Sequence, residues 1–300
     1  MDLDALTGCL ASPSCLVTQT TSGLIIGMLL FLVAVGLTLI FGVLKVVNFT
    51  HGAFYMFGAY FAMTAYQLTG SFALAMLCGA AGTAVLGLVF ERVFMSRVYG
   101  ANVLMQLLVC YGFVLIFDDV VKIVWGVEFK SMGMPPAFQM PPLFIAGGVV
   151  PPFYLFLIGA AFVIGLALWL IIDKTRLGKT IRAAAHNPGM VAALGINTGL
   201  LYGLVFALGG LLAGFAGALA APVRSLTPGM GFSILIESFI VTVIGGMGSI
   251  IGAFVASLAL GLIRSFGSLG FPLFTDGLMY LFMVIVLIAK PTGLFGKEIA

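Results

Sequence analysis

The sequence predicts an all-α protein, a polytopic bundle of about eight to ten transmembrane helices joined by one sizeable cytoplasmic loop. Hydrophobic residues make up 62% of the 300 residues, and charged residues only 8%. The mean hydropathy is +1.25, and apolar runs of about 20 residues, the length that crosses a bilayer, recur along the chain. Residues 173–198 form the one long polar and basic island. We therefore expect residues 1–300 to form a single transmembrane domain with no separate soluble domain.

Apolar segments of spanning length follow one another from residue 20 onwards. The segment after His51 is short and rich in Gly, and the two segments that flank residues 245–249 are also compatible with one broken or re-entrant element. The candidate spans are residues 20–43, 52–68, 72–90, 103–121, 153–172, 199–221, 232–247, 250–264 and 275–290.

Basic residues predict the orientation of these spans, because short loops rich in Lys and Arg stay in the cytoplasm. With the basic island inside, alternation of the spans predicts an external N-terminal segment, residues 1–19, and a cytoplasmic C-terminus. The cations expected inside are Lys45, Arg92, Arg97, Lys174, Arg176, Lys179, Arg182, Lys290 and Lys297, and those expected outside are Lys122, Lys130, Arg224 and Arg264.

The first 19 residues carry no cation, so they do not resemble the basic start of a cleaved signal peptide. Cys9 and Cys15 share this external segment. A small disulfide and two free thiols are both compatible with it, and we favour the free thiols. Cys78 and Cys110 fall within spans, where we expect small apolar packing residues.

Motifs for catalysis are absent from the sequence. Gly178-Lys179-Thr180 resembles the end of a phosphate-binding P-loop, but that motif needs a glycine where Asp173 stands. The two histidines, His51 and His186, are too far apart in the sequence to indicate a metal site. The net charge of +3 follows from the cytoplasmic cations, so it does not indicate a nucleic-acid partner.

The basic island predicts two short helices. The first runs through residues 183–185 and is expected to end near His186, because a proline disfavours helical geometry in the residue before it. Such a pair of helices between two spans is compatible with a simple connector and equally with a contact site for a partner protein.

The second helix of the island has clear start and stop signals. Asn187 is a good N-cap, Pro188 suits the first helical position, and Gly195 can take the left-handed conformation that ends the helix. The exposed face of this helix is expected to include Met190 and Val191.

The run RAAAHNPGMVAALGIN, residues 182–197, resembles the coupling loop of ABC-importer permeases, specifically those of the branched-chain amino-acid (LIV-type) family. GLTLIFGVLKVVNFTHGAFYMFGAY at 36–60, VIGGMGSIIGAF at 243–254 and PTGLFG at 291–296 are similar to the same family. In that family the loop docks into a groove on a separate ATPase subunit. The resemblance therefore implies that residues 173–198 are an ATPase-coupling loop, with Arg182, His186, Asn187, Pro188, Met190 and Gly195 as its coupling residues.

The resemblance also implies a complex in the bacterial inner membrane. Its partners would be a second, homologous permease subunit, two ATP-binding subunits and a periplasmic solute-binding protein. ATP and Mg would be bound by the ATPase subunits, with no cofactor on this chain. The cargo implied is a small amino-acid-like solute, a branched-chain amino acid or a related compound.

A polar group interrupts the first apolar stretch at Asn48, Thr50 and His51. Asn48 and His51 can satisfy backbone groups freed by a helix break, which a membrane tolerates only inside protein or beside a water-filled cavity. The small residues Gly52 and Gly58 let neighbouring helices approach closely. Discontinuous helices also mark substrate sites in transporters, so a structural role and direct contact with the solute both stay open.

Glu237 is a carboxylate inside an apolar span, where charge is costly and usually faces the bundle interior or a cavity. It departs from the family pattern, in which this position is more often neutral or basic. Two alternatives stay open: protonation or pairing near the outer end of the span, and contact with a cationic group of the solute. The predicted pathway residues are Asn48, His51, Gly52, Gly58, Glu237, Gly245, Gly246 and Gly248.

Asp118 and Asp119 end the fourth span close to Lys122, which favours a solvated interfacial cluster, with Trp125 as an interfacial anchor. The loop that follows, residues 122–152, holds six of the twelve prolines. Proline stiffens such a loop, so it is a candidate landing surface for an external solute-binding protein or a lid over the bundle.

The main alternative function is a stand-alone secondary transporter or channel, in which Asp118, Asp119, Glu237 and Asp276 would serve ion coupling or selectivity. The ABC-importer function is favoured because these carboxylates are few and mostly lie near span ends. An intramembrane enzyme ranks last, because the sequence offers no nucleophile paired with a base.

Overall fold

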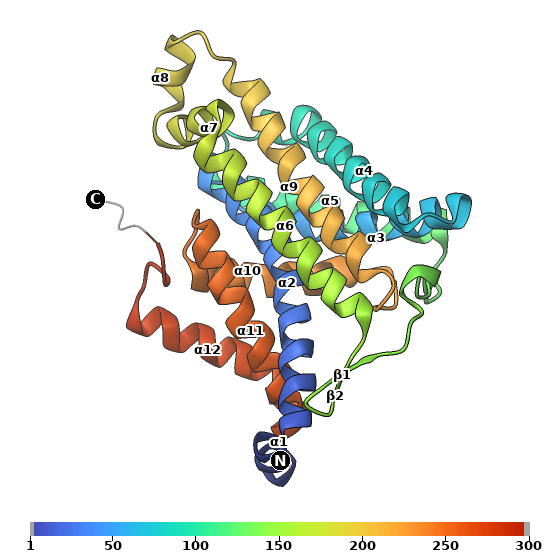
Figure 1. Ribbon diagram of the computed structural model, residues 1–300. Helices are drawn as coiled ribbons and strands as arrows, with labels where there is room; N and C mark the ends of the chain where they lie inside the picture. Colours follow the sequence, from blue (N-terminus) through green and yellow to red (C-terminus); the bar gives the residue numbers. More distant parts are fainter. Residues whose placement is uncertain (1–2, 297–300) are drawn as a thin grey trace.

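The structure, a computed structural model, describes residues 3–296 and is almost entirely helical (Figure 1). Lys297, predicted to be cytoplasmic, lies outside the described residues. The α-helices are α1 (Leu3–Ala11), α2 (Pro13–Leu44), α3 (His51–Thr69), α4 (Phe72–Val93), α5 (Val103–Trp125), α6 (Pro152–Lys174), α7 (Arg176–His186), α8 (Pro188–Ala193), α9 (Thr198–Ala220), α10 (Met230–Gly245), α11 (Ile250–Gly270) and α12 (Thr275–Ala289). The short elements are the 3-10 turns η1 (Met95–Arg97), η2 (Pro136–Phe138) and η3 (Pro272–Phe274), and the strands β1 (Leu143–Ile145) and β2 (Gly148–Val150).

Each predicted span corresponds to one of the long helices, which confirms a polytopic helical membrane protein. Within the described chain, six helices are long and apolar enough to cross a membrane, namely α2, α4, α6, α9, α11 and α12, and α10 is a shorter apolar helix. Two of the helices are clearly longer than their predicted spans, which were 20–43 and 250–264. Helix α2 begins at Pro13, because proline suits the first helical turn, and α11 continues to Gly270.

Two ends of the molecule are clearly distinct (Figure 1). Helices α7 and α8 lie at one end, whereas α1 and the antiparallel β1–β2 hairpin lie at the other, with α2 running between them. The hairpin packs on the first turns of α2, where the Val149 amide donates to the Thr18 hydroxyl at 3.3 Å. Residues 1–19, predicted as an external segment, thus include α1 and the start of α2.

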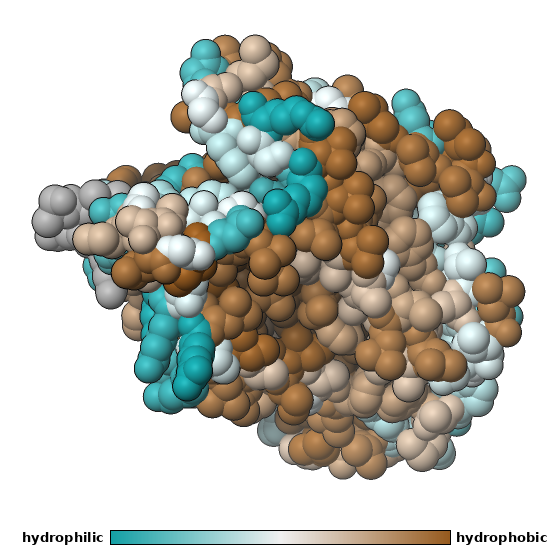
Figure 2. All heavy atoms as spheres, turned by 90° about the horizontal axis from the view of Figure 1, so that it is seen from above, coloured by the Kyte–Doolittle hydropathy of each residue, from teal (hydrophilic) through white to brown (hydrophobic). Residues whose placement is uncertain are grey.

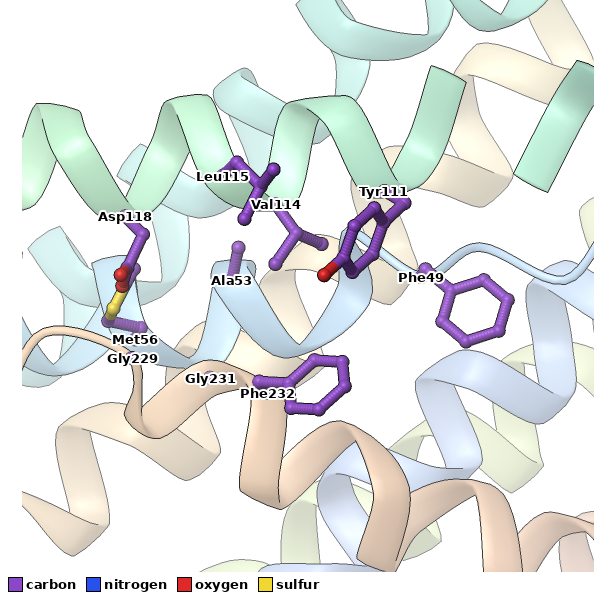
Figure 3. A pocket seen from close by; sticks show the side chains of 10 residues that line it. All are labelled: Phe49, Ala53, Met56, Tyr111, Val114, Leu115, Asp118, Gly229, Gly231 and Phe232. Carbon is purple, nitrogen blue, oxygen red and sulfur yellow. The ribbon is translucent and has the colours of Figure 1, made fainter. Parts of the chain in front are cut away.

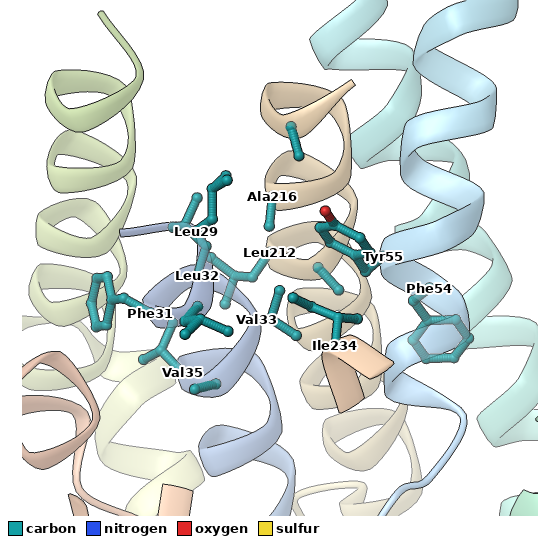
Figure 4. Close-up of a cluster of buried hydrophobic side chains, with 14 of the residues drawn as sticks. Leu29, Phe31, Leu32, Val33, Val35, Phe54, Tyr55, Leu212, Ala216 and Ile234 are labelled. Atoms are coloured by element: carbon teal, nitrogen blue, oxygen red, sulfur yellow. The ribbon is translucent and has the colours of Figure 1, made fainter. Parts of the chain in front are cut away.

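Helix α2 is the centre of the bundle. Of its most apolar 18 residues, 83% are buried, and it contacts α6, α9, α10 and α11. Figure 4 shows its Leu32 and Val33 packed toward Leu212 of α9 and Ile234 of α10. A helix that is apolar on all sides must be covered on all sides by protein or lipid, and here other helices provide that cover.

Close backbone contacts join α3 to α9 and α10. A Cβ atom on Gly52 would overlap the carbonyl oxygen of Gly231, and one on Gly58 would overlap the backbone of Gly214. Small residues allow such approaches, which give van der Waals packing in lipid, where the hydrophobic effect does not drive helices together. The start of α3 therefore meets the start of α10 deep in the bundle.

The surface is largely apolar. Figure 2 views the molecule from the end that carries α7 and α8, and hydrophobic side chains cover most of the visible face, with hydrophilic ones gathered on one side and along the opposite edge. Helix α5 exposes a long series of apolar residues, including Leu104, Leu108 and Leu115. Such a surface is suited to lipid or to another apolar protein surface.

Cys9 and Cys15 form a disulfide, so the preference for free thiols was wrong. The physical reason is the turn at Ser12, which joins α1 to α2 and holds the two Cα atoms 5.1 Å apart, within the range that a disulfide spans. Cys110 is buried as predicted, whereas Cys78 is exposed on α4 and is not a packing residue.

Candidate functional site

The loop from Thr175 to Asn197, here called the α7–α8 loop, has its helices defined by side-chain caps. The Asn187 side chain accepts a hydrogen bond from the Met190 amide at 3.0 Å, and Pro188 occupies the first turn of α8. Gly195 follows with φ of +81°, a left-handed conformation that favours glycine. The predicted break near His186 and the predicted second helix are therefore both confirmed.

Arg182 bonds the α7–α8 loop to α6, the span that precedes it. Its guanidinium donates to the carbonyl oxygen of Ile172 in the last turn of α6, and lies 3.9 Å from the Asp173 carboxylate. The ring nitrogen Nδ1 of His186 lies 3.0 Å from the carbonyl oxygen of Arg182. Cations at a helix C-terminus stabilise its free carbonyl groups. Arg182 thus holds α7 against α6, and a displacement of the loop would be transmitted to that span.

The far side of the α7–α8 loop is exposed and partly apolar. Met190 and Leu194 are 61% and 73% exposed. Val191 was predicted to be exposed as well, but only 3% of it is. The reason is helical geometry, because neighbouring positions of α8 point in different directions and Val191 faces the rest of the protein. Exposed apolar side chains beside polar loops are typical of a protein contact site.

At the same end of the bundle, the segment 291–296 bonds to the end of α10, so two of the sequence motifs meet. The amides of Leu294 and Phe295 donate to the carbonyl oxygens of Ile244 and Gly245, at 2.7 and 3.1 Å. Gly246, with φ of +96°, forms the turn against which this segment packs. Residues 243–254 and 291–296 are therefore parts of one contact, although 36 residues separate them in the sequence.

The polar break before α3 is deeply buried. The side-chain oxygen of Asn48 accepts from the Thr50 amide at 3.1 Å and from the Thr50 hydroxyl. The ring nitrogen Nε2 of His51 lies 3.0 Å from the carbonyl oxygen of Val33, in the middle of α2. These bonds satisfy groups that a helix break frees. Neither Asn48 nor His51 lines the two cavities described next.

The first cavity, here called the Glu237 cavity, has a volume of about 470 Å³. That volume lies within the range of sites for small molecules. It opens between α3, the connector from α9 to α10, and the helices α10 and α11. Its lining residues are Tyr55, Arg224, Ser225, Thr227, Pro228, Gly229, Met230, Ser233, Ile234, Glu237 and Arg264.

Glu237 and Arg264, which both line the Glu237 cavity, form an ion pair. Glu237 Oε1 lies 2.5 Å from Arg264 Nη1, while Asp276 lies 3.9 Å from the same guanidinium and is largely exposed. The second carboxylate oxygen, Oε2, is buried and has no hydrogen-bond partner among the described residues. Of the two alternatives left open for Glu237, the structure bears out pairing, with Arg264, while contact with a cationic group of the solute stays a prediction.

The second cavity, here called the Phe232 cavity, is smaller and mostly apolar (Figure 3). Its volume is about 210 Å³. It lies between α3, α5 and the start of α10, and it meets the Glu237 cavity at Gly229, which lines both. Its lining residues are Phe49, Ala53, Met56, Tyr111, Val114, Leu115, Asp118, Gly229, Gly231 and Phe232.

Asp118 belongs to the predicted cluster with Lys122 and also lines a cavity. It pairs with Lys122 at 3.2 Å, as does the exposed Asp119 at 2.9 Å, which agrees with the predicted cluster. However, Asp118 also lines the Phe232 cavity, and its Oδ1 atom is buried without a hydrogen-bond partner among residues 3–296. Sequence reasoning also missed Arg224 and Arg264 as cavity residues, treating them only as outer cations. No local pattern joins either of them to Glu237.

The predicted proline-rich loop, residues 122–152, includes the β1–β2 hairpin, which lies at the end of the bundle opposite α7 and α8 (Figure 1). Lys130 and Leu226 exchange two backbone hydrogen bonds, of 2.9 and 2.8 Å, so the loop is bonded to the connector that lines the Glu237 cavity. Trp125 donates from Nε1 to the Thr64 hydroxyl at 2.8 Å and therefore packs against α3. Predicted roles as a lid or as a landing surface are both compatible with this position.

Of the predicted pathway residues, only Glu237 lines either cavity. Gly52 and Gly58 hold α3 against its neighbours, Gly245 packs on Gly252 of α11, and Gly246 holds the turn described above. Gly248, with φ of +92°, lies in that same turn. A direct role of these residues in solute passage stays a prediction.

Comparison with known proteins identifies the family. The family model described as "Branched-chain amino acid transport system / permease component" matches residues 19–287. The chain belongs to this family. It is therefore a membrane-spanning transport permease subunit, and its relatives are permeases rather than enzymes. The resemblance inferred from four short motifs is thereby confirmed.

Two curated relatives of this permease match over nearly their whole length. The high-affinity branched-chain amino acid transport system permease protein BraD of Pseudomonas aeruginosa is 31% identical, covering 93% of this chain and 95% of BraD. The corresponding protein LivH of Escherichia coli K12 is 28% identical, with the same coverage.

A solved structure shares the fold of the permease. PsaBC from Streptococcus pneumoniae in complex with Fab gives a TM-score of 0.52, covering 98% of both chains at 12% identity. At that identity the likeness concerns the fold alone.

Proposed function

We propose that this permease is the transmembrane subunit of an ATP-binding-cassette importer that moves a branched-chain amino acid or a related small solute across a bacterial inner membrane. The observation that carries the proposal is the α7–α8 loop, in which two short capped helices present Met190 and Leu194 outward while Arg182 ties them to α6. The names of BraD and LivH supply the cargo class.

The α7–α8 loop has the properties that mechanical coupling requires. It is short, side-chain hydrogen bonds cap the starts of both of its helices, and α7 contacts α2, α6 and α9. A push on Met190 or Leu194 would therefore reach several spans at once, and rigid-body movement of packed helices is a common route between two states. In such an importer two partner ATPase subunits would bind ATP and Mg, and this chain would supply the path of the solute through the membrane.

The two distinct ends of the molecule are consistent with the remaining proposed partners. The end with α7 and α8 would face the cytoplasm and the ATPases, and the end with α1 and the β1–β2 hairpin would face the periplasm and a solute-binding protein. The Cys9–Cys15 disulfide supports this orientation, because disulfides persist in the periplasm and not in the reducing cytosol. A second, homologous permease would complete the path, and its contact would cover part of the apolar surface.

The test is purification of the tagged permease from native membranes in mild detergent. We expect two ATPase subunits and a second permease to co-purify, and ATP hydrolysis to rise when solute and solute-binding protein are added. Purification of this chain alone, with transport in liposomes driven by an ion gradient, would overturn the proposal in favour of a secondary transporter.

Matched variants then test the α7–α8 loop itself. Arg182→Ala and Pro188→Ala should lower solute-stimulated ATP hydrolysis and transport several-fold while membrane insertion stays normal. Lys179→Ala is the control, because Lys179 is exposed on α7 and, among residues 3–296, takes part in no ion pair. Normal coupling in both loop variants would show that the loop does not transmit ATP hydrolysis.

A further inference from the structure

We propose that the Glu237 cavity is a binding site, within the permease itself, for a zwitterionic amino acid at the outer side of the membrane. This inference rests on the proposed function and adds to it, since it assigns each charged group of the solute to a side chain. Arg224 would bind the carboxylate, and Glu237 would bind the ammonium group through its free oxygen.

The charges around the Glu237 cavity match such a solute. Glu237 is already paired with Arg264 through Oε1, whereas Oε2 is buried without a hydrogen-bond partner in the described chain. A buried carboxylate oxygen without a partner is costly, and an ammonium group can supply the missing donor. No carboxylate among residues 3–296 lies within salt-bridge distance of Arg224, so this cation is available to an anion.

Further features place opposite charges side by side. Tyr55, Arg224 and Glu237 all line this cavity, so a cation and a carboxylate face the same space. The 16-residue helix α10 begins at the cavity, where Gly229 and Met230 line it. The positive end of the α10 dipole therefore adds to Arg224 in favouring an anionic group. Hydroxyl groups of Ser233 and Thr227 complete a polar lining.

The position of the Glu237 cavity suits a receiving site. Arg224 follows α9, and Arg264 lies near Ser265, which bonds to Gln19 in the outer part of α2 at 2.7 Å. The cavity thus opens on the half of the bundle that carries the hairpin and α1.

The experiment uses a cysteine reporter inside the cavity. Ser225 lines the cavity and is exposed, so Ser225→Cys in a Cys78→Ser background should react with a hydrophilic maleimide. The permease is purified with its co-purifying subunits but without solute-binding protein. The control reporter is Gln139→Cys, an exposed residue of the outer loop that does not line the cavity.

The probes separate the two charges. L-leucine and L-alanine carry both groups, 4-methylpentanoate carries only the carboxylate, and 3-methylbutylamine carries only the ammonium group. We expect at least one amino acid to slow labelling of Ser225→Cys but not of Gln139→Cys, with each single-charge probe needing about tenfold higher concentration or more. The proposal is overturned if neither amino acid protects, or if the single-charge probes protect equally well.

Two substitutions assign the charges, and each has a built-in control. Glu237→Gln should weaken protection by L-leucine about tenfold and leave protection by 4-methylpentanoate unchanged. Arg224→Gln should weaken protection by L-leucine and leave 3-methylbutylamine unchanged, whereas Arg224→Lys should retain most of the protection. Equal weakening of every probe would mean that the substitutions distort the cavity, which would refute the assignment.

A separate assay distinguishes this inference from the proposed function. ATP-driven uptake of L-leucine and L-alanine is measured in liposomes that contain the complete complex with solute-binding protein. Normal uptake without protection of Ser225→Cys would overturn only the cavity assignment. Protection without ATP-driven uptake would overturn only the importer function.

Discussion

The α7–α8 loop and the Glu237 cavity differ in how far apart in the sequence their bonded residues lie. In the loop, Asn187 caps an amide three residues away, and Arg182 reaches a carbonyl group ten residues away. In the cavity, Glu237 pairs with Arg264, which is 27 positions away on another helix, and Tyr55 of α3 completes the lining from a third helix. The difference teaches that the loop is a local structure, whereas the cavity exists only when the whole bundle has formed.

That contrast predicts that substitutions at the cavity act on the whole bundle and those in the loop act locally. The largest effect is expected for Arg264→Leu, which leaves Glu237 as an uncompensated, largely buried carboxylate. We expect a loss of about 3 kcal/mol in the free energy of unfolding, measured by thermal unfolding in detergent.

The matched variant replaces both partners of this ion pair. Glu237→Leu combined with Arg264→Leu should unfold within about 1 kcal/mol of the original protein, because two apolar side chains can replace a buried pair. An equal loss in the single and the double variant would show that the ion pair is not what Arg264 contributes.

The next effect concerns the backbone contact between α3 and α10. Gly52→Ala should lower the free energy of unfolding by about 2 kcal/mol, because its methyl group would overlap the Gly231 carbonyl oxygen. Gly112→Ala on α5 is the control, since a Cβ there meets no atom within 4 Å. Equal unfolding midpoints for the two variants would refute the close contact as a stabilising feature.

A smaller, local effect is expected in the α7–α8 loop. Asn187→Ala removes the cap of α8 and should cost about 1 kcal/mol. Hydrogen exchange of the amides in residues 189–193 should accelerate while the spans exchange as before. Asn197→Ala, which removes the cap of α9, should accelerate exchange only at the start of that helix. Faster exchange throughout the bundle after Asn187→Ala would contradict the local character of the loop.

The smallest effect is expected at the exposed end of α5. Asp119→Asn should change the free energy of unfolding by less than about 0.5 kcal/mol, because exposed ion pairs contribute little and Lys122 keeps its contact with Asp118. The same thermal unfolding measurement applies. A loss above about 1 kcal/mol would mean that this cluster belongs to the cavity region rather than to the surface.

Different parts of the candidate site were predictable to different degrees. Asn187, Pro188 and Gly195 were found because caps and left-handed glycines depend on the neighbouring residues alone. The exposure of Val191 was misjudged, since the side that α8 turns to the protein depends on how the loop packs. Glu237 was noticed as a charge in an apolar span, but its partner Arg264 could not be found from spacing.

The sequence by itself determined the membrane-spanning helical class, the family, the break before α3 and the capped helices of the α7–α8 loop. Hydropathy, proline and capping residues act over a few neighbours, so these features are already present in short segments. The tertiary structure alone decided the disulfide, the contact of residues 243–254 with 291–296, and the two cavities. Those features depend on which helices meet, and close packing of many distant side chains and glycines decides that.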